Sequence, residues 1–479
     1  MNGKKLPTAY DTGPGSKSVE SMPYIQSMKF TFWALLALVN FSLSAQKLPK
    51  SGLLEDLTFL NKAIQEGHPV NYTQDKPVHI HPLIDSITGL NTDSISANHY
   101  RLIIGKALQY TECIHTNVSE NPLLSQMGKA SYFPLRTVVL NQRLFICSND
   151  TLEDLQGREV TAINNVSVRE VLIPELLNYT VSDGGTEAWS LALLNLYSSY
   201  LISFYLDYPD TFHVDLGDES LSLPAASNPL LNCQKRFQSD QLITRRDSSK
   251  TVVITLQSFD TSDKTELRSF FKSRSSSTEN LILDLRGNTG GNRKMAVWLT
   301  QQLVDTSFEY SIVQPKELNT PKYLDGTGKF QFFLSRLKYN LGDFLKGRKT
   351  EGGRTFTYSY RPSSQTFKGQ VYVLTDGFTC SSATMVCSWL KQHSQAVFIG
   401  SQTGGGYNGN NGGSFPSLTL PYSQMKIRFA VYRLVLDGDS PQNEGLLPDY
   451  PINYTIEDVL LQRDLAMEKA LSLLATPRP

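Results

Sequence analysis

The stretch VYVLTDGFTCSSATMVCSWLKQHSQAVFIGSQTGGG, residues 371–406, decides the fold. It begins with an apolar run typical of a buried β-strand, passes through the polar turn 376–379, and continues into a helical pattern that opens with Ser381 and Ser382. A second short apolar run, 396–399, leads into a glycine-rich loop. A strand, a turn, a helix and another strand in this order predict an α/β core.

Ser381 lies where the helix of this stretch is expected to begin. Backbone N–H groups at a helix N-terminus are unpaired, and the helix dipole favours negative charge there. The position therefore suits a nucleophile whose reaction creates an oxyanion. It equally suits an ordinary N-cap serine. This stretch alone leaves both interpretations open.

Length and charge limit the class of protein. The 479 residues are enough for two or three domains, and hydrophobic and charged fractions of 40% and 19% are typical of a globular protein. Because 45 Lys and Arg balance 45 Asp and Glu, we expect no nucleic acid as the main partner. No Cys/His cluster has zinc spacing, so we expect neither a metal nor a cofactor.

The N-terminal residues are not expected to belong to the fold. Residues 1–27 are polar, and we interpret them as an unstructured tail or a wrongly assigned start. Residues 28–45 combine Lys29, an apolar run and small residues, a pattern typical of a signal peptide and too short for a membrane span, which needs about 20 apolar residues. We therefore expect export to the periplasm, the cell envelope or the medium. The five cysteines are too few and too scattered to predict a disulfide framework.

The rest of the chain divides into several parts. Helical spacing in 51–66 and around 102–110 predicts a helical N-terminal region. The motif G-x-E-V-x-x-I-N within 155–168 resembles the strand–turn–helix of PDZ domains, which bind peptide ends. The predicted parts are the helical region 46–130, a PDZ-like module 131–223, a linker 224–250, an α/β core 251–455 and a C-terminal helix 456–479. Within the core, 305–369 is predicted to be an insertion, either a lid over substrate or a solvated excursion.

A second motif, DLRGNTGGN at 284–292, follows a strand-like run in the core. A Gly-Gly turn after a buried strand can aim backbone N–H groups at a developing oxyanion, which makes Gly290 and Gly291 candidates for this role. The chain contains neither G-x-S-x-G nor G-x-x-x-x-G-K-[ST], so a lipase-like hydrolase and a nucleotide-binding loop lose support. The residues alone permit serine-based acyl transfer without establishing it.

Three segments in this order and spacing resemble the tail-specific, or C-terminal-processing, serine peptidase family: LILDLRGNTGG, VYVLTDGFTCSSAT and VFIGSQTGGG. The resemblance is strong over 280–292 and 371–406 and weak over the rest of 50–475. It implies a ClpP/crotonase-like α/β peptidase core in a multidomain chain. It also implies that Ser381 is the nucleophile, and that the N–H groups of Ser382 and of Gly290 or Gly291 form an oxyanion hole.

The chain departs from the Ser–Lys branch of that family. The lysine of the family's G-K-G loop is replaced by Gly406, so the chain is more similar to the tricorn-like branch, which uses histidine and glutamate. Ile114-His115-Thr116 resembles the histidine turn of that branch, although Cys113 stands where an acid or a glycine is common. The segment NEGLLPD, 443–449, resembles its glutamate segment. The implied triad is Ser381 as nucleophile, His115 as general base and Glu444 as the residue that orients His115.

The sequence thus predicts an exported serine peptidase that cleaves polypeptides, near C-termini or elsewhere, through an acyl-enzyme. The alternative is a non-catalytic protein that binds peptides or apolar ligands on the same fold. A third hypothesis makes Cys380 the nucleophile. The sequence leaves the substrate and the oligomeric state open.

Overall fold

The computed structural model describes residues 47–72, 78–120, 131–148, 153–230, 233, 241–246, 250–260, 262–273, 278–315, 320–343, 347–350, 353–436 and 444–474. The tail 1–27 and the signal peptide 28–45 that the sequence predicts lie outside these residues. Within the described parts, no helix has both the length and the apolar character that crossing a membrane requires.

The N-terminal region is helical, as predicted. Leu53, Leu57, Leu60 and Ile64 are fully buried along one face of α2, which explains the helical spacing in the sequence. The next helix that the sequence predicts is α4, whose N-cap Ser96 accepts a hydrogen bond from His99 N–H. The elements are β1 (Lys47–Pro49), α2 (Lys50–Gly67), α3 (His81–Thr88), β2 (Ser94–Ser96), α4 (Ala97–Gln109) and β3 (Asn117–Glu120).

The following module has a hydrophobic core of its own, which includes Phe133, Ile163 and Phe212. Two small sheets, with strand orders β4-β5-β6 and β10-β9-β7-β8, surround it, and α6 packs on β4. The elements are β4 (Arg136–Leu140), β5 (Arg143–Ser148), β6 (Glu159–Val160), β7 (Ala162–Ile163), β8 (Val166–Ser167), α5 (Ile173–Leu177), α6 (Ala188–Tyr205), β9 (Thr211–Asp215) and β10 (Ser220–Pro224). The resemblance to PDZ domains stays a prediction.

A disulfide joins Cys147 of β5 to Cys233, with 5.9 Å between the Cα atoms. The sequence predicted no disulfide framework, and this pair was not foreseen. The two cysteines are 86 residues apart, so their spacing along the chain carries no signal. Only the fold brings them together.

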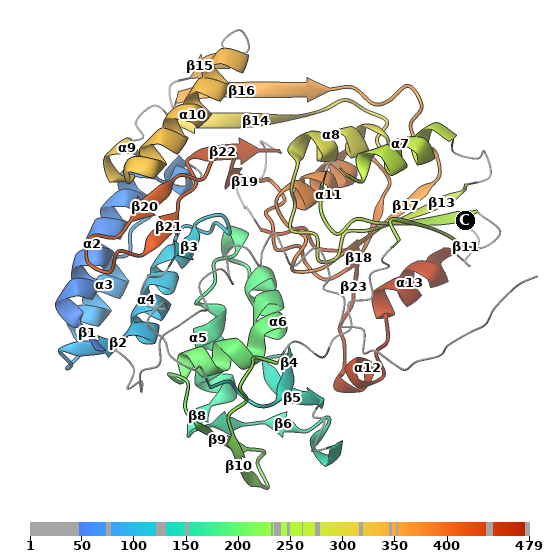
Figure 1. The fold of residues 1–479 in the computed structure, drawn as a ribbon. Helices are drawn as coiled ribbons and strands as arrows, with labels where there is room; N and C mark the ends of the chain where they lie inside the picture. Colours follow the sequence, from blue (N-terminus) through green and yellow to red (C-terminus); the bar gives the residue numbers. More distant parts are fainter. Residues whose placement is uncertain are drawn as a thin grey trace, which may run out of the picture. The chain divides into compact units, whose positions relative to one another are not determined.

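The central sheet has the strand order β11-β12-β13-β17-β18-β23 and is parallel except for the edge strand β11 (Figure 1). Alternate residues of its strands face two cores: one with α7, α8 and α11, and one with α13 (Leu465–Leu474). Such double coverage explains the continuous apolar runs of the strands. The strands are β11 (Ile243–Arg246), β12 (Thr251–Thr255), β13 (Asn280–Asp284), β17 (Gln370–Thr375), β18 (Val397–Gly400) and β23 (Tyr450–Pro451); the helices are α7 (Lys264–Ser273), α8 (Arg293–Gln301) and α11 (Ser382–His393).

Two predictions about boundaries are wrong. The linker 224–250 contains β11, which pairs with β12 as an antiparallel edge strand. The single C-terminal helix is two helices, α12 (Ile456–Leu460) and α13 (Leu465–Leu474). The chain turns between them at Gln462, which has a positive φ of 52°, and Asp464 accepts the Met467 N–H at the start of α13.

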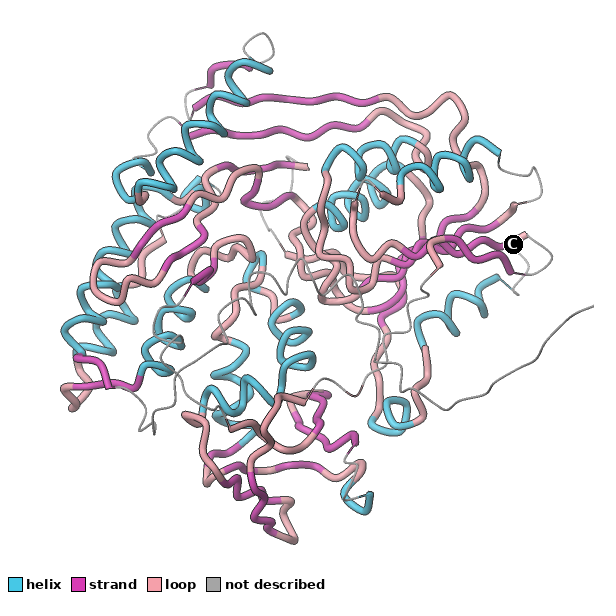
Figure 2. The backbone as a smooth tube through the Cα atoms, in the orientation of Figure 1, coloured by secondary structure: helices cyan, strands magenta, loops and turns pink. Residues whose placement is uncertain are grey.

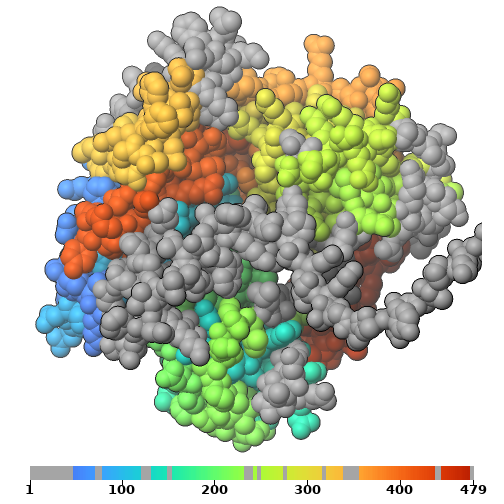
Figure 3. All heavy atoms as spheres, viewed as in Figure 1, coloured from blue at the N-terminus to red at the C-terminus, as the bar shows by residue number. Residues whose placement is uncertain are grey.

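The insertion 305–369 is not a solvated excursion. Its strands β14, β15 and β16 join β22 and β19 in a five-stranded sheet (Figure 2). Phe308, Tyr310 and Phe356 are buried in the main core. Helix α10 lies at the molecular surface (Figure 3), with Phe330 and Phe333 exposed. The elements are β14 (Phe308–Pro315), α9 (Thr320–Tyr323), α10 (Gly326–Asp343), β15 (Gly347–Thr350), β16 (Gly353–Tyr360), β19 (Gly409–Gly412) and β22 (Tyr432–Val435).

A small sheet connects the N-terminal region to the core. Its order is β20-β21-β3, with β20 (Ser417–Thr419) and β21 (Lys426–Arg428). Because β3 begins directly after Thr116, this pairing places the turn that carries His115 against loops of the core.

Candidate active site

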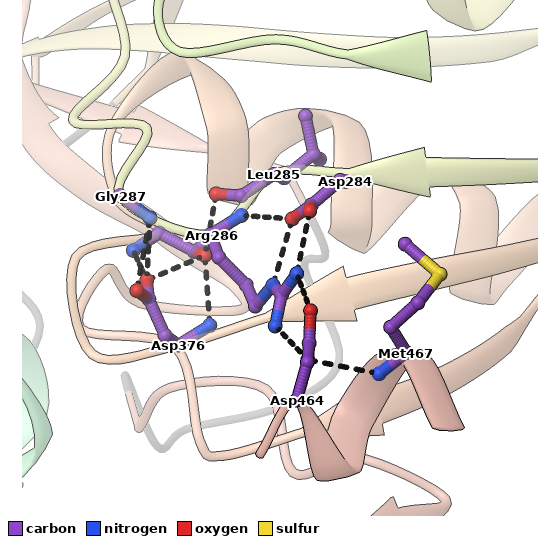
Figure 4. Close-up of polar contacts among 8 residues, drawn as sticks. Asp284, Leu285, Arg286, Gly287, Asp376, Asp464 and Met467 are labelled. Carbon is purple, nitrogen blue, oxygen red and sulfur yellow. Dashed lines mark hydrogen bonds and ion pairs between the residues drawn. The ribbon is translucent and has the colours of Figure 1, made fainter. Parts of the chain in front are cut away.

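The loops that follow β13 and β17 meet at one end of the sheet and are joined by Asp376. Its two carboxylate oxygens are each 2.9 Å from the Gly287 nitrogen, whose N–H they accept (Figure 4), and Oδ1 also accepts the N–H groups of Phe378 and Thr379. Cys380 N–H donates to the Asn288 carbonyl. These bonds hold the DLRG loop against the residues that precede α11.

Ser381 has a strained backbone, with φ 55° and ψ −122°. This combination is almost restricted to glycine, costs about 1–3 kcal/mol in other residues, and is typical of functional sites. Its side chain makes no capping hydrogen bond to α11. The ordinary N-cap interpretation of Ser381 is therefore wrong, and its hydroxyl is available for chemistry.

Unpaired backbone donors surround Ser381. Among the described residues, neither Ser382 N–H nor Gly291 N–H has an acceptor, whereas Gly290 N–H donates to Asn288 Oδ1 at 2.9 Å. A Cβ atom placed on Gly290 would lie 2.7 Å from the Ser381 Cβ and 2.9 Å from the Ser382 N. The Gly-Gly turn thus packs directly on the serine, and the free donors next to it are those of Ser382 and Gly291.

Gly290→Ala should lower kcat/KM by at least about 10²-fold, because the turn would have to move away from Ser382 and each misplaced oxyanion donor costs about that much. Gly290 also has a φ of +102°, which alanine resists. The measurement is hydrolysis of a denatured protein substrate. Gly326→Ala is the control, since nothing lies within 4 Å of its added Cβ. An unchanged rate in Gly290→Ala would separate this turn from catalysis.

His115 is 8% exposed and stacks on Phe415 with ring centroids 4.9 Å apart. Burial lowers the pKa of His115 to about 3, and the nearby positive charge of Arg428 acts in the same direction. The imidazole is therefore neutral at physiological pH, as a general base must be. Its buried Nδ1 has no hydrogen-bond partner among the described residues.

The neighbouring turn is held by a second buried histidine. The Nδ1 of His68 accepts the Val70 N–H at 3.2 Å, so Nε2 carries the proton and donates to Thr116 Oγ1 at 2.8 Å. Thr116 Oγ1 also accepts the Ala430 N–H. This network needs neutral His68, and burial lowers the pKa of His68 to about 3.

The protein should consequently lose stability in acid. Below pH 6.5, His68 of the unfolded chain takes up a proton that the folded chain excludes, so its contribution to stability is complete above pH 6.5 and declines towards pH 3. The free energy of unfolding should fall by about 1.4 kcal/mol for each unit by which the pH is lowered within this range. Urea unfolding of the wild type and His68→Gln at several pH values measures it. Equal pH slopes in the two proteins would contradict this role for His68.

Asp183 was not predicted from the sequence, yet it connects the His115 turn to the glycine loop. Its Oδ1 accepts the Ile114 N–H at 2.9 Å and its Oδ2 accepts the Gly406 N–H at 3.2 Å. Asp183 is fully buried, and burial raises its pKa to about 6. The only signal in the sequence is an Asp-Gly-Gly turn before a helix, which does not reveal the partners of its carboxylate.

Glu444 contacts the glycine loop at Gly406 through its backbone and not through its side chain. Its carbonyl accepts the Tyr407 N–H at 2.8 Å, and Gly406 and Gly445 form an isolated antiparallel bridge. The Glu444 side chain is exposed and has no hydrogen bond to His115 among the described residues. The preceding residues 437–443 lie outside the described part of the chain.

Cys380 is poorly suited to be the nucleophile. Its side chain is 2% exposed, and its Sγ lies 3.5 Å from the Thr289 carbonyl oxygen. Burial raises the pKa of its thiol well above the ordinary value, and the reactive form of cysteine is the thiolate.

Part of the chain is similar in sequence to a known protein family, and most of it is similar in structure to solved proteins. Residues 250–452 match the sequence profile of peptidase family S41. Mature CPAF is similar in structure, with a TM-score of 0.56 and 14% identity over 89% of this chain and 96% of that one. Mature CPAF complexed with lactacystin has a TM-score of 0.56 and 13% identity, over 89% of this chain and 97% of that one. The photosystem II D1 C-terminal processing protease has a TM-score of 0.37 and 14% identity, over 87% of this chain and 98% of that one.

No curated protein sequence matches the chain. At such low identities the CPAF structures establish the shared fold, and the family match covers the segment that contains both the Gly-Gly turn and Ser381.

Proposed function

We propose that this chain, whose residues 250–452 match the profile of peptidase family S41, is an exported serine-type peptidase that cleaves polypeptides with Ser381 as the nucleophile. The observation that carries this assignment is the strained backbone of Ser381 at the N-terminus of α11, next to the unused N–H groups of Ser382 and Gly291. An attacking oxygen and two donors for the oxyanion are together there.

In the proposed reaction the Ser381 Oγ attacks a peptide carbonyl while His115 accepts its proton. The tetrahedral oxyanion accepts hydrogen bonds from Ser382 N–H and Gly291 N–H, because Gly290 N–H is already bonded to Asn288. His115 then protonates the leaving amine, and water hydrolyses the acyl-enzyme. Glu444 orients His115 once its side chain turns inward from its exposed position beside the Gly406 loop.

Export has independent support from the Cys147–Cys233 disulfide, since disulfides persist mainly in oxidising compartments. We further propose that the module over residues 131–223 holds the substrate chain, near its C-terminus, as PDZ domains do. Its separate hydrophobic core is compatible with a unit that binds independently of the peptidase core.

A fluorophosphonate probe tests the proposal, because it forms a covalent bond with an activated serine. We expect the wild type to be labelled, and both Ser381→Ala and His115→Ala to lose the label. Cys380→Ala should keep the label, since its buried thiol takes no part. Labelling that persists in Ser381→Ala would reject Ser381 as the nucleophile.

One observation favours the alternative, a non-catalytic binding protein. His115 is stacked under Phe415, and the Glu444 side chain is exposed, so the proposed triad is not assembled in this conformation. Absence of labelling in a folded wild-type protein would support this alternative.

A further inference from the structure

Cys113, His115 and Asp183 form a cluster that no spacing along the chain predicts, because Asp183 lies 69 residues after Ile114. One donor atom from each residue, the Cys113 Sγ, a ring nitrogen of His115 and a carboxylate oxygen of Asp183, lies within 4.8 Å of the other two. Thiolate, imidazole and carboxylate are the ligands that zinc takes in proteins. We propose that these three residues bind Zn²⁺ and that the bound ion holds the peptidase inactive.

The polar atoms of the cluster are buried but poorly paired. Cys113 is fully buried, and its Sγ makes a long 3.7 Å hydrogen bond to the Asn411 carbonyl, which is weak because a thiol is a poor donor. Among the described residues, the buried His115 Nδ1 has no partner. An unpaired buried polar atom costs about 1–3 kcal/mol, so native proteins rarely keep one without a use. A metal ion would satisfy both side chains.

Asp183 is fixed in place for such a role. Its carboxylate accepts backbone N–H groups from Ile114 and from Gly406, one on each oxygen. Each carboxylate oxygen has a further lone pair, which remains for a cation. Hydrogen bonds of this kind orient metal ligands in known sites.

The ligand types and charges favour zinc over harder cations. Calcium and magnesium prefer oxygen ligands throughout, whereas a thiolate with an imidazole selects zinc. Binding releases the Cys113 thiol proton to solvent, and the resulting thiolate and the Asp183 carboxylate balance the two charges of the ion. Arg428 near His115 and Arg433 near Asp183 oppose the cation, so we expect binding to be reversible.

Zinc on His115 would stop catalysis whichever ring nitrogen it used. A neutral imidazole has one nitrogen with a free lone pair, while the other carries a hydrogen. Once zinc occupies that lone pair, His115 cannot accept the Ser381 proton. This inhibitory effect rests on the proposed function; the binding of zinc does not.

Binding is tested on the full chain carrying Ser381→Ala, titrated with Co²⁺ and then with Zn²⁺. We expect one equivalent of Co²⁺ with a cobalt–thiolate charge-transfer band that Zn²⁺ displaces. Adding Cys113→Ala should abolish the band and weaken zinc binding at least about 100-fold. A smaller loss would be typical of a residue that only hydrogen-bonds a metal ligand, whose removal weakens binding about 10–100-fold. Cys387→Ala, which removes another fully buried free thiol, should change neither. No band, or a band that survives Cys113→Ala, overturns the site.

To test inhibition, the rate of substrate hydrolysis is measured for each protein once with a chelator and once with added Zn²⁺, and the two rates are compared as a ratio. We expect zinc to inhibit the wild type and Cys387→Ala reversibly, and to leave the rate of Cys113→Ala unaffected. Zinc binding without inhibition would overturn the regulatory role. Zinc binding to a chain that hydrolyses nothing under any condition would overturn the proposed function and leave the metal site standing.

Discussion

Replacing Ser381 with alanine should lower kcat/KM for polypeptide hydrolysis about a millionfold, the effect of removing the nucleophile from a serine protease. The unfolding free energy should stay within about 0.5 kcal/mol of the wild type, because alanine and serine share the strain of the φ 55°, ψ −122° backbone and the Ser381 hydroxyl caps nothing. Hydrolysis of denatured casein and urea unfolding measure the two quantities. A wild-type rate in Ser381→Ala would refute the assignment.

Ser381→Gly separates the strain from the chemistry. Glycine adopts this backbone freely, so the variant should be as inactive as Ser381→Ala but more stable than the wild type by up to about 1–3 kcal/mol. Ser394→Ala is the matched control at the other end of α11, where the hydroxyl donates to the Leu390 carbonyl. It should hydrolyse substrate within about twofold of the wild type, since Ser394 is half-buried at the far end of the helix from Ser381.

Arg286→Met should lower the unfolding free energy by about 3–5 kcal/mol, the cost of breaking a buried ion pair by removing one partner. The Arg286 guanidinium bonds both carboxylate oxygens of Asp284 (Figure 4). The Arg286 side chain is 11% exposed and the Asp284 side chain 2%. It also bonds both oxygens of Asp464, with Nη1–Oδ1 at 2.6 Å and Nη2–Oδ2 at 3.0 Å. The variant would leave these carboxylates buried without a counter-charge.

Arg463→Met is the control for that substitution. Arg463 precedes Asp464 and pairs with Asp458 and Glu468, but its side chain is 46% exposed. Exposed pairs contribute about 0–1 kcal/mol, so its loss should be small. Urea midpoints at constant m-value give both free energies. Equal losses in the two variants would show that the Arg286 pairs contribute no more than surface pairs.

The parts of the fold that the sequence predicts are those fixed by local patterns. The apolar run before Asp376 becomes β17, and the helical pattern after Ser381 becomes α11, because each is determined by periodicity and turn residues over a few positions. The Gly-Gly turn at 290–291 was identifiable for the same reason: its backbone conformation demands glycine.

The features that escaped prediction depend on distant contacts. Strand β11 is short and polar, and its identity comes from pairing with β12. The partners of Asp183 lie in the His115 turn and in the glycine loop, far away in both directions along the chain. The roles proposed for His115 and Glu444 rest on resemblance to a family, since no local pattern distinguishes a loop histidine or a turn glutamate from ordinary surface residues.

The Cys147–Cys233 bridge has a practical consequence for producing the protein. It closes a loop of 86 residues that contains Asp183 and the whole of α6. By chain entropy, a cross-link of this length stabilises the folded state by about 4–5 kcal/mol, a large fraction of the stability of a typical domain. Recombinant protein should therefore be made in an oxidising compartment. Protein made in the reducing cytosol would lack this disulfide, and its measured stability would be lower than that of the oxidised protein.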